Sequence, residues 1–236
     1  YFLSTKLSNF APQTWSYQES VKMYRNSMKE LKTDYLDYYL LHAIGGKGDE
    51  GRKAIHQRYL DNGMLDFLIK ERSAGRIRNL GFSFHGEPDI FDWLLSMHKD
   101  VHWDFVLIQM NYLDWENSGA EYLYRRLEEL SIPALVMEPL LGGRLVKLPD
   151  AVVAKLKQRE PNRSVASWAF RFAGTPKGIL SVLSGMTYME HLQDNLRTYM
   201  PLKPISDDEH QFLMETAKMI VKYPTIPCND CKYCMP

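Results

Sequence analysis

The chain has 236 residues, 45% of them hydrophobic and 25% charged, which is enough for one core of about the size of a single α/β barrel. Lysine plus arginine and aspartate plus glutamate each number 29, so the formal net charge is zero and no basic field favours nucleic acid or acidic lipid. No apolar run approaches the ~18 residues of a membrane span, and Tyr1–Lys6 lacks the basic leader of a signal peptide. We therefore expect no nucleic-acid partner and no membrane partner.

Short apolar segments alternate with helical segments along the whole chain. The predicted strands are Tyr1–Lys6, Tyr35–His42, Ile77–Ser83, Phe105–Gln109, Ala134–Glu138 and Ile179–Ser184. This alternation predicts a parallel sheet with helical crossovers. The apolar runs lack a clean two-residue alternation, which is typical of strands that are covered on both faces.

Helical spacing and end signals predict the segments between the strands. A helix is expected after Ser16, with Val21, Tyr24, Met28 and Leu31 on its apolar face, and another around Leu65, Leu68 and Ile69 that stops at Gly75. A third is expected to begin at Pro88. Further helices are expected over Ala120–Leu130, Asp150–Lys157 and Ser164–Ala173. Capping boxes are expected at Ser16–Glu19, Thr187–Glu190 and Ser206–Glu209. A polar, glycine-rich connection is expected over Gly45–Lys53.

The predicted fold class is α/β, a (β/α)8 barrel with its first two strands missing from this chain. Six strands are two fewer than a closed barrel needs, and an open parallel edge is a liability. Either two strands precede Tyr1 or the sheet is open. Because the chain opens on strand-like sequence without an initiator methionine, we expect a piece of a longer protein. The expected domains are a partial barrel over residues 1–205, then a C-terminal helix and the start of a cysteine-rich segment over residues 206–236.

Polar side chains at the carboxyl ends of the first two predicted strands are candidates for chemistry, because a parallel barrel places its active site at that end. His42 closes the second strand; the alternative is a core histidine satisfied by a neighbour. Lys6 closes the first strand, where a barrel mouth would require a nearby carboxylate or polarised hydroxyl. The alternative is a lysine that points into solvent.

Several linked motifs together resemble the aldo-keto reductase family in order and spacing. They are Ser4–Lys6, Thr33–His42, Gly75–Ser83, Gln109–Tyr112, Met137–Leu145, Ser184–Thr187 and Asp194–Asn195, and they span about the first 200 residues. The resemblance implies a barrel that transfers hydride between NADP or NAD and a small-molecule carbonyl or alcohol.

The resemblance also implies catalytic roles for two residues. In the family a tyrosine protonates the carbonyl oxygen, a lysine paired with an aspartate assists it, and a histidine orients the carbonyl; Lys6 and His42 match the lysine and the histidine. A phenol titrates near 10, so a neighbouring ammonium helps it to act near neutrality. The tyrosine and the aspartate would lie before Tyr1, so this fragment alone is expected to be inactive.

Further matching positions imply contacts with the cofactor. Ser83 and Gln109 match residues that hydrogen-bond the nicotinamide carboxamide, a group that both donates and accepts. Met137 stands where many members stack an aromatic ring on the nicotinamide. The chain departs from the family after Ser83, where members often have asparagine and this chain has Phe84, His85 and Gly86. A surface histidine is expected at His85, and a substrate-loop residue is the alternative.

Glycines and a helix start suit the phosphate groups of the cofactor. Gly142 and Gly143 permit close approach of a diphosphate, and the segment Ser184, Gly185, Met186 and Thr187 precedes a predicted helix that carries Asn195. Between Ser184 and Leu196 there is no lysine or arginine, and His191 is the one possible cation. Because Arg and Lys are the usual partners of a ribose phosphate, the choice between NADP and NAD stays open.

All three cysteines, Cys228, Cys231 and Cys234, lie in the last nine residues. An odd cluster without distant partners is no disulfide framework and favours a reducing, cytoplasmic setting. The C-x2-C-x2-C spacing is typical of the opening of a bacterial [4Fe-4S] run, with a fourth ligand outside this chain; zinc is the alternative. The run also resembles the iron–sulfur extension of one bacterial branch of the family.

Two classes of function follow from these patterns. The first is the oxidoreductase, with the loop over Ala43–Lys53 expected to help in selecting the substrate, and with a possible redox partner for the cluster. The second is a nucleotide-sensing or electron-transfer binding module that keeps the cofactor cleft without carbonyl chemistry. A tyrosine and an aspartate in the sequence ahead of Tyr1 would favour the enzyme.

Overall fold

The computed structural model describes residues 1–223, which form two compact units. The first unit comprises Tyr1–Ile108 and Arg125–Ala134, and the second comprises Gln109–Tyr124 and the chain from Leu135 onward. Within residues 1–223, no helix combines the length and the apolar character needed to cross a membrane.

Strands and helices alternate in the first unit, as the sequence pattern predicts. Its elements are β1 (Ser4–Leu7), η1 (Pro12–Thr14), α1 (Tyr17–Leu31), β2 (Leu36–Gly46), α2 (Gly48–Ile55), the π-helical turn η2 (His56–Leu60), α3 (Met64–Ser73), β3 (Ile77–Gly86), α4 (Pro88–Ser96), α5 (His98–Val101) and β4 (Phe105–Gln109). Strand β4 has the bounds predicted for it, and the other strands of this unit overlap their predicted ranges.

The second unit continues the alternation. Its elements are α6 (Asp114–Asn117), α7 (Ala120–Glu129, whose last turns belong to the first unit), β5 (Ala134–Met137), α8 (Asp150–Arg159), α9 (Val165–Gly174), β6 (Ile179–Val182), α10 (Met189–Tyr199) and α11 (Asp207–Val221).

All strand pairs with a recorded register are parallel, and strand order in the sheet follows chain order from β1 to β6. Lys6 is the partner of Leu40 on β2, and Leu40 is the partner of Gly81 on β3. The amide of Leu183, directly after β6, donates to the carbonyl of Val136 on β5 at 2.8 Å. A parallel α/β sheet with helical crossovers is therefore present, as predicted.

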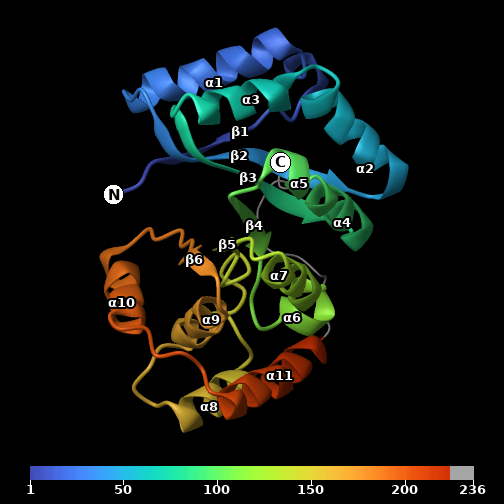
Figure 1. Cartoon of the computed structure of the whole chain (residues 1–236). Helices are drawn as coiled ribbons and strands as arrows, with labels where there is room; N and C mark the ends of the chain where they lie inside the picture. The colour runs from blue at the N-terminus through green and yellow to red at the C-terminus, as the bar shows by residue number, and fades with distance from the viewer. Residues whose placement is uncertain (224–236) are drawn as a thin grey trace. The chain divides into compact units, whose positions relative to one another are not determined.

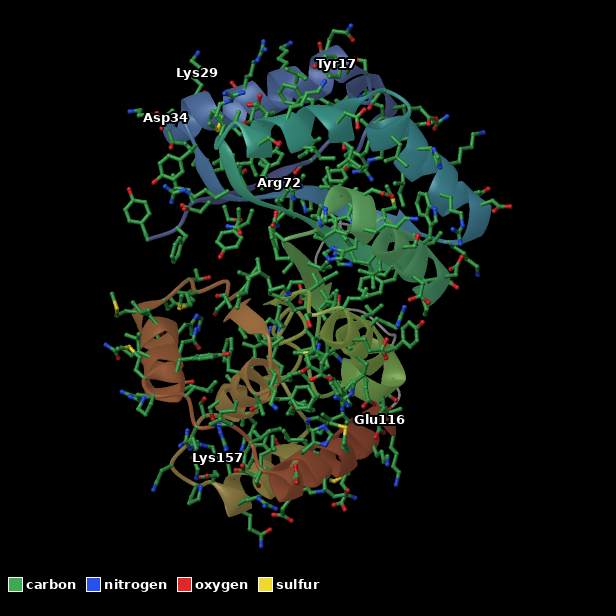
Figure 2. The ribbon with its side chains drawn as sticks, viewed as in Figure 1. Tyr17, Lys29, Asp34, Arg72, Glu116 and Lys157 are labelled. Atoms are coloured by element: carbon green, nitrogen blue, oxygen red, sulfur yellow. The ribbon has the colours of Figure 1, made fainter. Side chains whose placement is uncertain are left out.

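In the first unit, α1 and α3 lie side by side along the strands β1–β3 (Figure 1). Aromatic rings fill the space between helices and sheet: the Tyr24 ring meets those of Tyr39 and Phe67 edge-on, with centroids 5.2 and 5.5 Å away. Tyr17, at the opposite end of α1 from Lys29 in Figure 2, also meets Phe67 edge-on. Val21 and Tyr24, which were expected on the apolar face of this helix, are buried, whereas Leu31 is 41% exposed.

The second unit is held by a buried ion pair between α9 and α11. The guanidinium of Arg171, which is fully buried, donates to both carboxylate oxygens of Glu209 at 2.9 and 2.7 Å. The hydroxyl of Ser206 accepts from the Glu209 amide, and the Glu209 side chain accepts from the Ser206 amide, so the predicted capping box is confirmed. The same carboxylate therefore begins α11 and anchors it to α9.

Two predictions about connections were wrong. The expected loop over Gly45–Lys53 is the end of β2 followed by α2. A Cβ at Gly45 would lie 2.2 Å from the carbonyl oxygen of His85, so the glycine permits β2 and β3 to run on together. The expected capping box at Thr187 is also absent, because α10 has Tyr188 as its N-cap and no side chain caps it.

Candidate functional site

The register of the first unit brings the two predicted catalytic residues to one face of the sheet. Lys6 on β1 is opposite Leu40, and His42 follows Leu40 by two residues on β2. Because side chains two apart on a strand point to the same face, Lys6 and His42 share a face. Gly81 is the partner of Leu40 on β3, so Ser83 and His85 belong to this face as well.

The ring of His42 is held by two residues that follow β1. The hydroxyl oxygen of Ser8 lies 2.6 Å from His42 Nδ1. The ring of Phe10 packs on the imidazole at a centroid distance of 4.8 Å and an interplanar angle of 53°. Because Nδ1 is engaged by Ser8, Nε2 is the ring nitrogen left for a ligand.

Burial and positive neighbours keep the imidazole of His42 uncharged. Burial of the ring, followed by the charges of Lys6, His85 and Arg58, lowers the pKa of His42 to about 4. At neutral pH the side chain is therefore a neutral imidazole, which has one donor nitrogen and one acceptor nitrogen. Such a ring is suited to hydrogen-bonding a carbonyl oxygen rather than to carrying a charge.

The peptide bond between His42 and Ala43 is held from both sides. Its carbonyl oxygen accepts from Arg58 Nη2 at 2.9 Å, and its N–H donates to Ser83 Oγ at 2.7 Å. Ala43 has a φ of +47°, a left-handed conformation that is costly for a residue with a side chain, and the register of β2 shifts between Leu41 and Ile44. The two bonds stabilise this bulge directly after the histidine.

Arg58 is a residue that the sequence analysis missed. It lies on the π-helical turn η2 and is only 8% exposed. Its guanidinium donates to the side-chain oxygen of Asn9 at 3.1 Å and to the hydroxyl of Tyr59 at 2.6 Å, in addition to the carbonyl of His42. In the sequence it stands in a polar stretch, and its partner Asn9 is 49 residues away, so no local pattern marks it.

The second unit contains a cavity of about 500 Å³. Seven of the predicted cofactor-binding residues line it: Met137, Gly142, Gly143, Ser184, Gly185, Met186 and Asn195. Residues from the loop after β5, the loop after β6 and the helices α9 and α10 complete the lining. The volume and the largely apolar lining are typical of a small-molecule or cofactor site.

Three residues that were predicted to contact the cofactor, Ser83, Gln109 and Thr187, do not line this cavity. The side-chain amide of Gln109 donates to Asp114 Oδ2 at 2.7 Å. The backbone amide of Thr187 lies 3.5 Å from His191 Nδ1. Ser83 belongs to the first unit, where its hydroxyl holds the amide of Ala43. In the structure these three predicted cofactor contacts are instead engaged with other groups of the protein.

The loop after β5 has an unusual backbone and an internal contact. Glu138 and Leu141 have φ values of +55° and +49°, and Gly142 and Gly143 also have positive φ. The carboxylate of Glu138 accepts from the amide of Gly142 at 2.5 Å. The amide of Gly142, where close approach of a diphosphate was expected, therefore already donates to a carboxylate.

The charged groups in the lining are acidic or weakly basic. Glu138, Asp194 and His191 are the ionisable residues among the described residues that line the cavity, which include no lysine or arginine. The hydroxyl of Ser164 donates to Asp194, and the side-chain amide of Asn195 donates to Ser184 Oγ at 2.9 Å. The polar end of the cavity is thus built from hydroxyls, an amide and carboxylates.

No group of three or more His, Cys, Asp or Glu side chains that could hold a metal ion occurs within residues 1–223. The predicted metal ligands Cys228, Cys231 and Cys234 lie outside the residues that the structure describes.

Comparisons with known proteins agree with this architecture. The sequence profile of the aldo/keto reductase family matches residues 1–217. No curated protein matches the chain. A solved aldo-keto reductase from Bacillus halodurans in its holo form is 19% identical, with a TM-score of 0.68, over 91% of this chain and 71% of that one. An aldo/keto reductase from Klebsiella pneumoniae, solved in complex with NADP and acetate, is 20% identical, with a TM-score of 0.68, over 93% of this chain and 70% of that one.

A third solved structure, an aldo/keto reductase from Brucella melitensis, is 20% identical, with a TM-score of 0.66, over 91% of this chain and 73% of that one. Similarity at this level of identity shows the fold, and the α/β barrel class predicted from the sequence is confirmed.

Proposed function

Since the chain belongs to the aldo/keto reductase family, we propose that its protein transfers hydride between a nicotinamide dinucleotide and a small-molecule carbonyl or alcohol. The observation that carries the proposal is the shared face of Lys6 and His42, with the imidazole held neutral. A neutral imidazole can hydrogen-bond the substrate carbonyl through Nε2, and an ammonium beside it favours a deprotonated phenol.

The tyrosine and the aspartate of the family's active site have no matching position in this chain. We propose that they are carried by two further βα units ahead of Tyr1. The Bacillus structure is compatible with this proposal in length, because the match covers 91% of this chain and 71% of that protein, so part of the relative has no counterpart here. Sequencing the gene upstream of Tyr1 tests it, and a start codon next to Tyr1 would contradict it.

The cofactor is proposed to bind in the cavity of the second unit. A nicotinamide dinucleotide supplies or accepts the hydride. Ser184, Asn195 and the backbone after β5 offer hydroxyl, amide and N–H groups to it. The acidic lining without lysine or arginine favours NAD over NADP, because a 2′-phosphate would meet carboxylates instead of cations.

Titration of the full-length protein with NADH and with NADPH, followed by nucleotide fluorescence, tests the cofactor and its type. Tighter binding of NADH is expected. Binding of neither nucleotide would overturn the proposed function, whereas tighter binding of NADPH would overturn only the choice between them. Turnover with a panel of aldehydes and ketones then measures the hydride transfer itself.

We also propose that Cys228, Cys231 and Cys234 ligate a [4Fe-4S] cluster together with a fourth thiolate beyond this chain. The spacing of the three cysteines supports it, and a reducing cytoplasm would keep the thiols available. A cluster at this place would exchange electrons with a redox partner. Iron and sulfide analysis of anaerobically purified full-length protein tests the proposal, and zinc alone would contradict it.

A second candidate is a binding module that senses the nucleotide without carbonyl chemistry. The contact between Glu138 and the Gly142 amide favours it, because a cofactor phosphate would compete with the carboxylate and could change the loop. Nucleotide binding without turnover of any carbonyl by the full-length protein would favour this module over the reductase.

A further inference from the structure

The hydrogen bond between Ser8 and His42 can have either of two polarities. A serine hydroxyl donates or accepts, and a neutral imidazole has its proton on one nitrogen only. If Ser8 donates to Nδ1, the ring proton is on Nε2. If Nδ1–H donates to Ser8, then Nε2 carries a lone pair. The distance of 2.6 Å between Ser8 Oγ and Nδ1 is compatible with both.

The surroundings of Ser8 favour donation to the ring. Within residues 1–223, the hydroxyl of Ser8 has no recorded hydrogen-bond partner other than His42 Nδ1. If Nδ1 were the donor, the hydroxyl proton would lack a protein acceptor in this half-buried place. If Ser8 donates, both the hydroxyl and the ring nitrogen are satisfied, and Nε2–H is free to meet an acceptor.

The charges around the ring act against the imidazolium. Lys6 on β1, His85 on β3 and Arg58 on η2 all disfavour a positive charge on His42. Within residues 1–223, Arg58 has no recorded ion pair with a carboxylate. Its recorded partners are neutral: hydrogen-bond acceptors of Asn9, His42 and Tyr59, and the rings of Phe10 and Tyr59. The charge of this buried guanidinium is therefore not neutralised by a carboxylate partner, and burial of such a charge lowers stability.

The backbone of His42 is positioned by the same guanidinium. Arg58 Nη2 and Ser83 Oγ hold the two ends of one peptide unit, and that unit precedes the left-handed Ala43. Rotation of this peptide would break both bonds. Because the imidazole is attached to the Cα next to this unit, the two bonds limit where Nε2 can point.

We propose that Ser8 and Arg58 are positioning residues that fix His42 as a neutral imidazole with its proton on Nε2. Ser8 selects the tautomer by donating to Nδ1, and Arg58 holds the backbone of His42 and adds a positive charge beside the buried ring. A carbonyl oxygen only accepts hydrogen bonds, so this tautomer is the one that can orient a carbonyl substrate; the purpose, though not the geometry, rests on the proposed function.

The tautomer is measured directly by NMR of the full-length protein labelled with ¹⁵N-histidine, without substrate or cofactor. His42→Gln identifies the His42 signals. At pH 7 we expect the pattern of a neutral ring protonated on Nε2. His56 is the internal control, because its Nδ1 lies 3.0 Å from the carboxylate oxygen Asp61 Oδ1, which can only accept when ionised. His56 is therefore expected with its proton on Nδ1.

Four substitutions, two at each position, test the roles of the two residues. Ser8→Ala is expected to give a mixture of the two tautomers at His42, while Ser8→Thr keeps the hydroxyl and the wild-type pattern. Arg58→Met is expected to raise the pKa of His42, and Arg58→Lys to raise it less. The His56 signals should be unchanged in all four variants, which also reports that the chain is folded.

The proposal is overturned if wild-type His42 carries its proton on Nδ1, a result that needs no variant. It is also overturned if Ser8→Ala leaves the tautomer unchanged in a folded chain. Failure of both NADH and NADPH to bind would instead remove the proposed function and leave the tautomer result standing.

Discussion

The surroundings of His42 and the cavity of the second unit differ in how much they are held in place: His42 is fixed by hydrogen bonds, whereas the cavity is open and largely apolar. Around His42, Ser8 holds the ring and Arg58 and Ser83 hold the backbone, with the cations Lys6 and Arg58 near the imidazole. The cavity has a volume of about 500 Å³, an apolar lining and carboxylates. A group that orients a reacting carbonyl must be held in place beforehand, whereas a pocket for an exchangeable cofactor must stay open.

The largest effect is expected where the network around His42 is broken. Arg58→Met removes the donor from the His42 carbonyl and from the side-chain oxygen of Asn9, and both acceptors lose this bond. We expect a loss of about 3 kcal/mol in the free energy of unfolding, measured by urea denaturation. Arg52→Met is the matched control. Arg52 is on α2, a third exposed and paired with Asp89 across 3.1 Å, so its loss should cost less than about 1 kcal/mol.

A comparable cost for the two arginine variants would mean that the buried network adds no more stability than a surface ion pair.

The next effect is the pH dependence of stability. His42 has a pKa of about 4 in the folded chain and 6.5 when unfolded, so between these values the unfolded chain binds more protons. Stability is therefore complete above pH 6.5 and falls as the pH decreases to about 4. For a ring that is partly exposed we expect about 2 kcal/mol or less. Urea denaturation at pH 7 and pH 4.5 measures the decrease.

His42→Gln should reduce this decrease. The pKa of His85 is also lowered, by desolvation and by Lys6, so His85→Gln is the comparison that separates the two rings. The carboxylates with lowered pKa values, Asp37, Glu71 and Glu209, lose their stabilising effect at lower pH and fall largely outside this window. If His42→Gln leaves the change in the free energy of unfolding between pH 4.5 and pH 7 as it is in the wild type, the conclusion that His42 is neutral and desolvated in the folded chain is contradicted.

The sequence predicted what depends on local pattern. Strand β4 was found at its predicted residues because Phe105–Ile108 is a continuous buried apolar run that Gln109 ends. Ser206 and Glu209 form the predicted capping box because both partners lie within one turn. The pair Lys6 and His42 could be anticipated from strand ends, since the register of parallel strands brings such ends together.

What the sequence could not predict depends on partners that are distant in the chain. Ser8 meets His42 across 34 residues and Arg58 meets Asn9 across 49, and neither has a local signal. The end of β2 was taken for a loop because Gly45 and Gly46 are typical of turns. They continue the strand instead because Gly86 approaches them so closely that a Cβ there would lie 2.5 Å from the Gly46 nitrogen.

A substitution in the cavity lining can change nucleotide affinity without altering any residue of the first unit. Ser184→Lys adds a cation to a lining that includes no lysine or arginine among the described residues. We expect the affinity for NADPH to rise about tenfold, ~1.4 kcal/mol, with little change for NADH. Gln193→Lys on α10 adds the same charge outside the lining and is the control. Equal gains for both variants would assign the effect to general attraction of an anion.

The smallest effect is expected at Glu138. This residue lines the open cavity and at the same time makes a preformed hydrogen bond within its own loop. Its carboxylate accepts from the Gly142 amide, so this loop is preorganised around a negative charge that a cofactor phosphate must replace or tolerate. Glu138→Gln keeps an acceptor of the same shape and removes the charge. We expect NADH and NADPH to bind about threefold more tightly, ~0.7 kcal/mol, because the repulsion is common to both diphosphates. Glu190→Gln on α10, outside the lining, controls for net charge. Weaker binding by Glu138→Gln would mean that the carboxylate supports the cofactor rather than opposing it.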